Sequence, residues 1–401
     1  MQHRIVVLGA GYSGAVVAGR LAKRLHREDV AITLVNPEPD FVERVRLHQL
    51  ATGQDLTPRP FSRMFAGTGV ELKLARVTAV DVDRRTVTIA AANGPAREEL
   101  AYDSLVYALG SGWNDGDVPG AAEHAHEVSS RPGTLRLRDR LAALDAGRPV
   151  VVVGGGLTGL EAATEIATAR PDLRITLAVR GTLGDWLSDK GRTHLRKVAD
   201  QLNITVHEHT AVTAVAADAV TTADGRAVPA EVTVWTTGFA VHPIAQATTL
   251  ELTDHGQIVV DATMRSVSHP DVYAVGDAAM AIGPNDKPLR MSCASSVPMA
   301  WQAADALAAR LTGAKVPRVS IRYFQQCISL GRKEGLIQFV TADDRAKDSA
   351  LTGRTAALYK ELVCKGAAWA IANPTTGLPT RRRRVTGQPA DVHGAPARTT
   401  A

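Results

Sequence analysis

Two glycine-rich turns in this sequence have the GxGxxG spacing that a dinucleotide-binding loop requires. The glycines are Gly9, Gly11 and Gly14 in the first turn and Gly154, Gly156 and Gly159 in the second. In such a loop the first glycine allows a tight turn, the second lets a pyrophosphate approach the backbone, and the third lets a helix pack closely on a strand. Free amides at the start of that helix then bind the phosphates. One match is weak support for a nucleotide site, whereas two in matching surroundings predict two sites.

The residues expected to read the adenosine ribose lie at the end of the second strand of each unit. They are Asn36 in the first unit and Arg180 in the second, at comparable distances after the first glycine of each motif. An acidic residue at this position hydrogen-bonds the ribose, whereas an arginine better suits a 2′-phosphate. Glu38 is the candidate substitute for the acid in the first unit. Arg180 favours NADPH over NADH, although an exposed arginine at a strand end is often only solvated.

Both glycine turns lie inside a β-α-β pattern, so the elements that position them are duplicated too. The expected strand, helix and strand span residues 5–8, 15–25 and 31–35 in the first unit and 150–153, 160–169 and 174–179 in the second. Short apolar runs indicate buried strands, and helical spacing of small and apolar residues indicates the helices between them. Further strands are expected at 72–82, 86–90 and 104–109 and again at 204–206, 211–215 and 232–236. This order predicts an α/β fold with two Rossmann-like dinucleotide-binding domains.

The last part of the chain predicts a further helix and a smaller domain. Ser295 or Ser296 is expected to cap a helix that carries Pro298 in its first turn. Two strands within residues 321–340 and a helix over residues 355–370 would then form a small α+β C-terminal domain.

Composition and charge limit the class of protein. A chain of 401 residues with 45% hydrophobic content can form two or three globular domains. The net charge of +5 comes mostly from residues 379–401, whose composition predicts a disordered basic tail beside a nearly neutral body. No nucleic-acid partner is therefore expected, and Arg381 to Arg384 would make at most weak peripheral membrane contact. Without a membrane-spanning apolar run or a signal peptide, a cytoplasmic location is expected.

The cysteines and histidines predict neither a redox disulfide nor a metal site. Cys293, Cys327 and Cys364 are too far apart in the sequence for a CxxC pair, and we expect reduced core thiols. The histidines, His48 among them, lack ligand spacing and are expected to be solvated or buried in a core.

Together these residues resemble the two-dinucleotide-binding-domain flavoproteins, a pyridine nucleotide-disulfide oxidoreductase-like superfamily, and within it the type II NADH dehydrogenase-like branch. Besides the glycine motifs, the matching stretches are RLHQLATG at 46–53, LVYALGS at 105–111, VWTTGF at 234–239 and DVYAVGDAA at 271–279. The resemblance implies that the N-terminal unit binds FAD and that an inserted central unit binds NAD(P)H. The implied divisions are 1–113 with 241–313 for FAD, 114–240 for NAD(P)H, 314–378 for the C-terminal domain and 379–401 for the tail.

The resemblance also assigns candidate site residues. Asp277 matches the aspartate that binds the ribityl chain of the flavin, and Gly110, Gly238 and Gly276 lie in the matching motifs. Glu161 matches a carboxylate near the nicotinamide and flavin rings and is the candidate catalytic residue. Its alternative role is that of a first-turn acid that the helix dipole favours.

Positive charge beside the flavin is expected from two sources. The start of the helix, with Val297 and Pro298, would lie against the isoalloxazine, where unpaired amides stabilise the reduced ring. Arg44 could add charge there, or it could instead pair with a nearby glutamate.

The implied activity is that of an FAD-dependent NAD(P)H oxidoreductase without a redox-active disulfide. Hydride would pass from the nicotinamide to flavin N5, and electrons then to a quinone or another small soluble acceptor. The family's quinone signature AQxAxQ departs here, with Trp301 and Asp305 in place of its glutamines, which favours a soluble acceptor. The alternatives are an apoptosis-inducing-factor-like flavoprotein with a signalling or sensing role, and a sulfide:quinone oxidoreductase-like enzyme using Cys293 and Cys327. The oligomeric state stays open, with a homodimer among the options.

Overall fold

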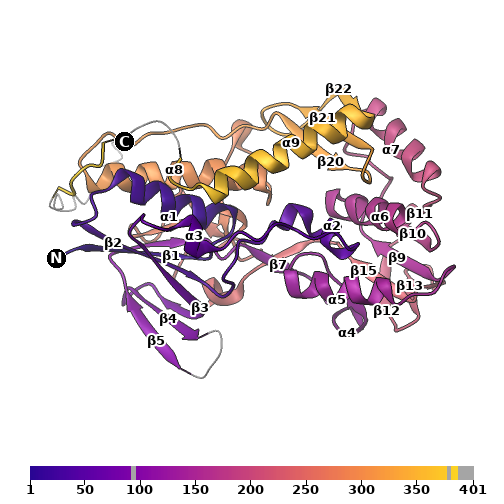
Figure 1. Ribbon diagram of the computed structural model, residues 1–401, viewed down its shortest axis with the longest axis horizontal. Coiled ribbons are helices and arrows are strands. Elements are labelled where there is room, and N and C mark those ends of the chain that lie inside the picture. The colour runs from indigo at the N-terminus through magenta and orange to yellow at the C-terminus, as the bar shows by residue number, and fades with distance from the viewer. Residues whose placement is uncertain (92–95, 377–380, 387–401) are drawn as a thin grey trace, which may run out of the picture.

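The computed structural model describes residues 1–91, 96–376 and 381–386, and it contains two Rossmann-like units followed by a smaller C-terminal unit (Figure 1). The predicted α/β class with duplicated dinucleotide-binding units is confirmed. No helix of the described residues is long and apolar enough to cross a membrane.

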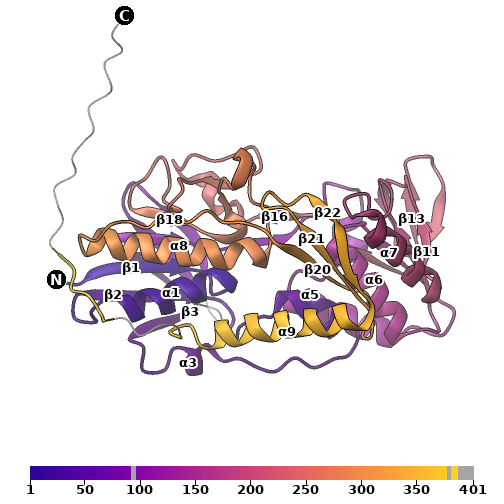
Figure 2. The same cartoon turned by 90° about the horizontal axis from the view of Figure 1, so that it is seen from above.

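The first unit is built on a seven-stranded sheet of order β18-β6-β1-β2-β3-β4-β5. Its strands are β1 (His3–Leu8), β2 (Val30–Asn36), β3 (Val70–Asp81), β4 (Thr86–Ala91), β5 (Arg97–Ala101), β6 (Ser104–Tyr107) and β18 (Val272–Ala274). The strands from β18 to β3 are parallel, as a nucleotide-binding sheet requires, and β4 and β5 continue it antiparallel. Helices α1 (Tyr12–Arg24) and α8 (Cys293–Leu311) pack side by side against the sheet (Figure 2).

The second unit has a five-stranded parallel sheet of order β11-β10-β9-β15-β8. Its strands are β8 (Ala125–His126), β9 (Pro149–Val153), β10 (Arg174–Ala178), β11 (Thr205–His207) and β15 (Val232–Trp235). The run of valines in β9 is apolar throughout because both faces are covered: Val150 and Val152 face one core, and Val151 and Val153 face another. The first core is closed by α5 (Arg131–Ala142), α6 (Leu157–Ala169) and α7 (Asp189–Gln201), and the second by β12 (Val212–Val215), β13 (Ala219–Thr222) and β14 (Ala227–Pro229).

The chain passes between the two units through a pair of short strands. These are β7 (Ser111–Trp113), after the first sheet, and β16 (Phe239–Val241), after the second, and they pair antiparallel. The boundaries expected at residues 113 and 241 fall in these two strands. Both crossings therefore lie next to each other, at the end of β6 in one unit and of β15 in the other.

The C-terminal unit consists of three antiparallel strands and one long helix. The strands are β20 (Gln325–Ser329), β21 (Gly335–Val340) and β22 (Ala346–Thr352), and the helix is α9 (Gly353–Ala372). The prediction of two strands missed β22, whose AKDSALT sequence is mostly polar and exposed and so lacks an apolar strand pattern. Helix α9 runs from this sheet back to α1 (Figures 1 and 2), where the space beside Gly19 is filled by Pro374.

Shorter elements connect these units. They are α2 (Leu47–Ala51), α3 (Phe61–Met64), α4 (Ala121–His124), β17 (Ile258–Val259) and β19 (Ala279–Met280), with 3-10 turns at Arg44–Arg46, Pro243–Ala247, Gly276–Ala278 and Pro284–Asp286.

The prediction of a disordered tail from residue 379 is wrong for residues 381–386, which lie against the first unit. The main chain of Arg383 pairs with α1: its amide donates to the carbonyl of Arg24 over 2.9 Å, and its carbonyl accepts from the amide of His26 at the same distance. Arg384 pairs with Glu28 and Asp29. Composition predicted disorder because polar, charged residues bury little surface, but main-chain hydrogen bonds hold this segment instead. Residues 379, 380 and 387–401 of the expected tail lie outside the described residues.

Candidate functional site

The first glycine turn has the geometry of an open phosphate cradle between β1 and α1. Gly9 has a positive φ of 89°, and a Cβ there would lie 2.5 Å from the carbonyl oxygen of Ala108. A Cβ on Gly14 would lie 1.8 Å from the carbonyl oxygen of Gly9, so no side chain fits between helix and strand. Gly11 has no neighbour within 4 Å of its Cβ position, which leaves space for a ligand at the backbone.

The second glycine turn repeats this geometry between β9 and α6. A Cβ on Gly154 would lie 2.6 Å from Oγ1 of Thr236, and one on Gly159 would lie 1.9 Å from the carbonyl oxygen of Gly154. Gly156 again faces open space. In both turns the first glycine makes the tight turn, the second leaves space for a ligand and the third allows close packing of helix and strand. This repeated geometry fits two dinucleotides.

The amides at the starts of α1 and α6 are left available. The N-cap residues are Gly11 and Gly156, neither of which has a side chain to cap the helix, and neither helix has an acid in its first turn. Open amides and a positive helix end at two glycine cradles suit two pyrophosphates.

The two residues expected at the riboses lie beside these cradles. The side-chain oxygen of Asn36 accepts from the amide of Ala10 over 2.9 Å, and its nitrogen donates to the carbonyl of Glu38 over 2.9 Å. Asn36 therefore holds the first glycine turn against the end of β2. Arg180 follows β10 and is exposed, with no ion pair among the described residues.

Several residues expected at the flavin converge around Asp277. Its Oδ2 accepts from the hydroxyl of Ser111 over 2.6 Å and lies 3.8 Å from a guanidinium nitrogen of Arg44. The same guanidinium lies over the ring of Phe239, 5.6 Å from its centroid, and 3.9 Å from the Cβ position of Gly110. Segments near residues 44, 110, 239 and 277 are thus brought to one place, next to β7 and β16.

Gly276 and Gly238 complete this region. Gly276 has a positive φ of 71°, which favours glycine, and its Cβ position lies 2.6 Å from the hydroxyl of Ser13, inside the first glycine motif. Gly238 precedes Phe239 and has open space at its Cβ position. The pairing of Arg44 with a glutamate does not occur: its ion-pair partner among the described residues is Asp277.

Helix α8 begins at Cys293, earlier than predicted, so its free amides precede Val297 in the sequence. The cap is Ser292, whose hydroxyl accepts from the amide of Ser295, and the first helical residue is Cys293. Val297 and Pro298 lie in the second turn, so the Val297 amide belongs to the helical hydrogen-bond pattern and Pro298 has no amide to donate. The prediction failed because Ser295 and Ser296 are also good caps and a proline is usual in a first turn.

Glu161 lies in a buried cluster rather than in the first turn of a helix. It is in the second turn of α6, where its Oε1 accepts hydrogen bonds from the ammonium of Lys360 and from the amide of Ser329, the latter over 3.0 Å. Its Oε2 lies 3.7 Å from Nδ1 of His48. The role of a first-turn acid is therefore excluded, and Glu161 joins the second unit to α2 and α9.

Around Glu161, burial lowers the pKa of two basic side chains, His48 and Lys360. Burial, and after it the charges on Lys360 and Arg46, lowers the pKa of His48 well below its usual value, so His48 is neutral. Burial likewise lowers the pKa of Lys360 from 10.5 to about 8, with Arg46 acting in the same direction and the Cys364 thiol opposing. Lys360 can therefore change its protonation near neutral pH.

This cluster lies close to the first glycine turn. Cys364 follows Lys360 by one turn on the same buried face of α9, and the pKa of Tyr12, next to Gly11, is raised well above its usual value. The causes are burial first, then Cys293, Glu43 and Cys364. The start of α8, the first turn of α1 and the middle of α9 therefore lie near one another.

Lys360 and His48 were not among the predicted site residues. The signal for Lys360 was present in the sequence, because Ala356, Lys360, Cys364, Ala368 and Ile371 follow helical spacing and form the inward face of α9. A single lysine on an otherwise apolar face needs a buried partner. His48 gave no such signal, since a lone histidine in a short helix is ordinary.

The residues of the altered quinone signature have structural partners. Asp305 pairs with Arg20 and Arg24, and Trp301 is exposed with Arg20 over its ring. Gln302 is buried and binds the main chain at Pro317 and Val319. These side chains tie α8 to its neighbours.

The prediction that all three cysteines lie in a core is wrong. Cys364 is buried, Cys327 is partly buried and Cys293 is exposed at the start of α8. Among the described residues there is no cluster of three or more ligands that could hold a metal ion.

Known proteins similar to this chain share its duplicated architecture. Residues 3–308 match the family described as pyridine nucleotide-disulphide oxidoreductase. An NADH dehydrogenase-like protein of Mycobacterium tuberculosis is 29% identical over 320 residues, which cover 74% of this chain and 78% of that protein. The demethylphylloquinone reductase of Synechocystis is 28% identical over 291 residues, which cover 69% and 72%.

Two solved structures illustrate the likeness in three dimensions. A type II NADH dehydrogenase, NDH2, of Plasmodium falciparum in complex with NADH superposes with a TM-score of 0.78 at 15% identity, covering 94% of this chain and 98% of that one. The sulfide:quinone oxidoreductase of Aquifex aeolicus superposes with a TM-score of 0.77 at 20% identity, covering 99% and 100%. At these identities the likeness is one of fold.

Proposed function

The chain belongs to the pyridine nucleotide-disulphide oxidoreductase family, and from that premise we propose that this FAD-dependent NAD(P)H oxidoreductase passes its electrons to a quinone. The observation that carries the proposal is the pair of open glycine cradles, together with Glu161, which lies on the helix that begins at the second cradle and pairs with Lys360 of α9. Several relatives are named for quinone reduction, and the sequence contains no CxxC motif to take the electrons instead.

Each cradle is assigned one cofactor. We assign FAD to residues 1–113 with 241–313 and NAD(P)H to 114–240, with 314–378 as the C-terminal domain. Gly9, Gly11 and Gly14 would accept the FAD pyrophosphate, and Gly154, Gly156 and Gly159 that of the nicotinamide dinucleotide. The chemistry that the two cofactors supply when bound is hydride transfer from nicotinamide to flavin and electron transfer onward to the acceptor.

Around the flavin, the chain supplies a hydrogen-bonding acid and a cation. Asp277, held by Ser111 and Arg44, would bind the ribityl hydroxyls, with Gly110, Gly238 and Gly276 allowing close approach. Val297 and Pro298 remain expected contacts through their side chains.

Glu161 and Lys360 are the expected proton carriers. Reduction of a quinone to a quinol takes up two protons, and a lysine with a pKa of about 8, bonded to a carboxylate, can release one and recover it near neutral pH. His48 beside Glu161 is neutral, so it can fix the carboxylate without competing for its charge.

We further propose that the nicotinamide substrate is NADPH and that Arg180 binds its 2′-phosphate. The support is the exposed guanidinium of Arg180 just past β10, where no carboxylate neutralises it among the described residues.

We place the enzyme in the cytoplasm, in peripheral contact with the membrane that dissolves its quinone. The support is the outward face of α9, where Leu358 is 60% exposed, Leu362 70% and Trp369 58%. Such an apolar stripe on one helix face, with Lys365 beside it, suits the interface of a bilayer. The sequence had favoured a soluble acceptor because Trp301 and Asp305 replace the glutamines of the quinone signature. Lys360 and Glu361 do not interrupt the apolar stripe, because Lys360 faces inward to Glu161 and Glu361 pairs with Arg46.

The test separates the two half-reactions in a stopped-flow instrument under anaerobic conditions. The enzyme is reduced with NADH or NADPH and then mixed with a quinone, ferricyanide or oxygen. Glu161→Gln should keep its FAD and slow quinone reduction, whereas Glu99→Gln, on the exposed strand β5, should match the wild type. An unchanged Glu161→Gln rate would remove Glu161 from the mechanism. Turnover below about 0.1 per second with every acceptor, against 1 to 1000 per second for typical enzymes, would favour a signalling flavoprotein.

A sulfide:quinone oxidoreductase-like activity is the second candidate, since the chain superposes along its whole length on such an enzyme. That chemistry requires a reactive thiolate, and burial raises the pKa of Cys327 to about 12. The Cys327 thiol therefore stays protonated at neutral pH. Reduction of the flavin by sulfide without NAD(P)H would reverse this ranking.

A further inference from the structure

A basic pocket lies at the far end of α1 from its glycine turn. The pocket has a volume of about 450 Å³ and is formed by the last turns of α1 and α8, the loop after α8 and the segment 381–383. Since α1 has 13 residues and a helix rises about 1.5 Å per residue, the pocket is roughly 20 Å from the FAD cradle. It is therefore separate from both dinucleotide sites.

The C-terminal segment closes one side of this pocket. The main chain of Arg383 pairs with both Arg24 and His26, and the amide of Thr386 donates to the carbonyl of Leu311 over 3.0 Å. These contacts fix the segment to the ends of both helices. The wall of the pocket is thus built from three parts of the chain that are far apart in sequence.

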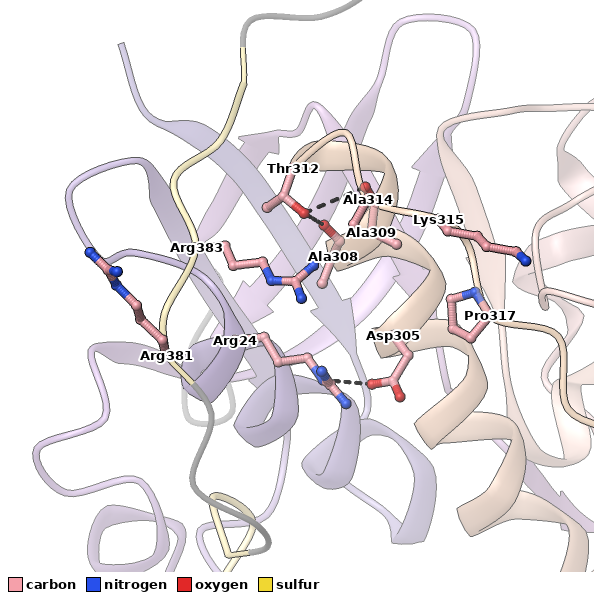
Figure 3. A pocket seen from close by; sticks show the side chains of 10 residues that line it. All are labelled: Arg24, Asp305, Ala308, Ala309, Thr312, Ala314, Lys315, Pro317, Arg381 and Arg383. Carbon is pink, nitrogen blue, oxygen red and sulfur yellow. Dashed lines mark hydrogen bonds and ion pairs between the residues drawn. The ribbon is translucent and has the colours of Figure 1, made fainter.

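The arginines of this segment alternate between two directions. The side chain of Arg382 donates to the main chain of α1, and Arg384 pairs with Asp29. Arg383 points into the pocket, toward Asp305, while Arg381 lies at the margin with its guanidinium turned outward (Figure 3). Arg383 is therefore the arginine of this segment whose side chain points into the pocket.

Positive charge in the pocket exceeds negative charge. Among the described residues, four cationic side chains line it, whereas Asp305 is the only carboxylate there. Asp305 already pairs with both Arg20 and Arg24. Neither Lys315 nor Arg383 forms an ion pair within the part of the chain that the structure describes.

Two further observations agree with this surplus. The pKa of Arg24 is lowered by burial, then by the charges on Arg20 and Arg383, despite the opposing effect of Asp305. The C-terminal ends of α1 and α8 contribute only about half a negative charge each. The pocket therefore retains net positive charge that an anion would neutralise.

We propose that this pocket binds a phosphate or pyrophosphate group, carried by a soluble metabolite or by a phospholipid headgroup. Arg383 would bind the oxygens with the planar fork that matches phosphate geometry. The ammonium of Lys315, which points away from Arg383 in Figure 3, would turn toward the ligand and add a point charge. The remaining lining is largely small and apolar, with Ala308, Ala309 and Pro317, and it would accept the part of the ligand that carries the phosphate.

The test uses the full-length holoenzyme with FAD bound and excess NADP⁺, so that both dinucleotide sites are filled. Inorganic pyrophosphate is titrated by calorimetry, and sedimentation is measured with phosphatidylglycerol vesicles and with phosphatidylcholine vesicles. The variant Lys315→Gln/Arg383→Gln removes two cations, and Arg63→Gln/Arg84→Gln removes two exposed, unpaired ones elsewhere as the control. The Arg383 main-chain bonds are unaffected by its substitution, and circular dichroism with flavin absorbance checks the fold.

We expect the pocket variant to weaken binding about tenfold or more, because two charge-assisted hydrogen bonds are lost, and the control to bind as the wild type does. Binding of pyrophosphate identifies a soluble ligand, and binding only to phosphatidylglycerol vesicles identifies a lipid headgroup. NAD(P)H oxidation should be the same in all variants. Absence of binding to both probes, or equal loss in the control, would overturn the proposal. If the double variant loses its FAD, Lys315→Glu alone serves, since Lys315 is in a loop.

Discussion

Lys360 allows a quantitative prediction about pH. If its ammonium donates a proton to the quinone, only protonated enzyme is competent, and the rate of quinone reduction follows that protonated fraction. With a pKa of about 8, about nine tenths of Lys360 is protonated at pH 7 and about one tenth at pH 9. The rate of this step should therefore be close to its maximum at pH 7 and fall about tenfold by pH 9.

The assay is stopped-flow mixing of reduced enzyme with a quinone between pH 6.5 and 9.5. Lys360→Arg keeps its charge throughout this range, so its rate, even if lower, should not depend on pH. Lys360→Met should be slow at every pH. A wild-type rate that stays constant to pH 9.5, or a Lys360→Arg rate that falls in the same way, would refute the assignment of the proton to Lys360.

The free energy of unfolding should rise with pH over the range in which the rate of quinone reduction falls. The unfolded chain keeps the lysine proton up to a pKa of about 10.5, whereas the folded chain releases it near 8. Between these values the unfolded state binds more protons, so this group makes the free energy of unfolding rise with pH, by at most about 3 kcal/mol. Urea unfolding of the wild type and of Lys360→Met at pH 7.5 and 9.5 measures how the free energy of unfolding of each protein changes with pH. An equal change in the two proteins would mean that the pKa of Lys360 is not perturbed.

Four further substitutions address the cofactor sites. Asp277→Ala should lose flavin absorbance, because it removes the carboxylate that Arg44 and Ser111 orient, and full retention of the yellow colour would remove Asp277 from the site. Gly156→Ala should weaken nicotinamide binding and leave stability unchanged, since the Cβ position of Gly156 is empty. Gly159→Ala should weaken binding and also lower the melting temperature, because its Cβ would lie 1.9 Å from a carbonyl oxygen. Equal melting temperatures of the two variants would contradict this. Arg180→Glu should shift preference from NADPH to NADH in steady-state kinetics, and unchanged selectivity would show that Arg180 does not contact the ribose.

Sequence patterns predicted the dinucleotide cradles because the structural requirement on each glycine is set by residues close to it in the sequence. Gly9 and Gly14 must lack side chains for reasons set within a few residues of the turn, and apolar runs mark the strands beside them. The start of α8 was misplaced because Ser292, Ser295 and Ser296 are all acceptable caps, and only packing selects one.

Contacts between distant segments could not be predicted in this way. Glu161 and Lys360 are separated by 199 residues, and nothing in either local sequence names the other as a partner. Helical spacing does put Lys360 on the inward face of α9, so the need for a partner was visible although its identity was not. For Arg383 the misleading feature was charge, because main-chain pairing to α1 does not depend on side-chain hydrophobicity.

The position of β18 constrains the order in which this protein can fold. The strand at Val272–Ala274 forms the edge of a sheet whose other strands all precede residue 102 or end at Tyr107, and the entire second unit is made in between. During synthesis the inserted unit can fold as a continuous segment, while in the N-terminal sheet β6 pairs with β1 on one side and has its other edge unpaired. Loop closure across so long an insertion is slow. If the second unit folds first, the ends of the insertion are brought close together and β18 can pair with β6 sooner. Destabilising the second unit should therefore delay folding of the first.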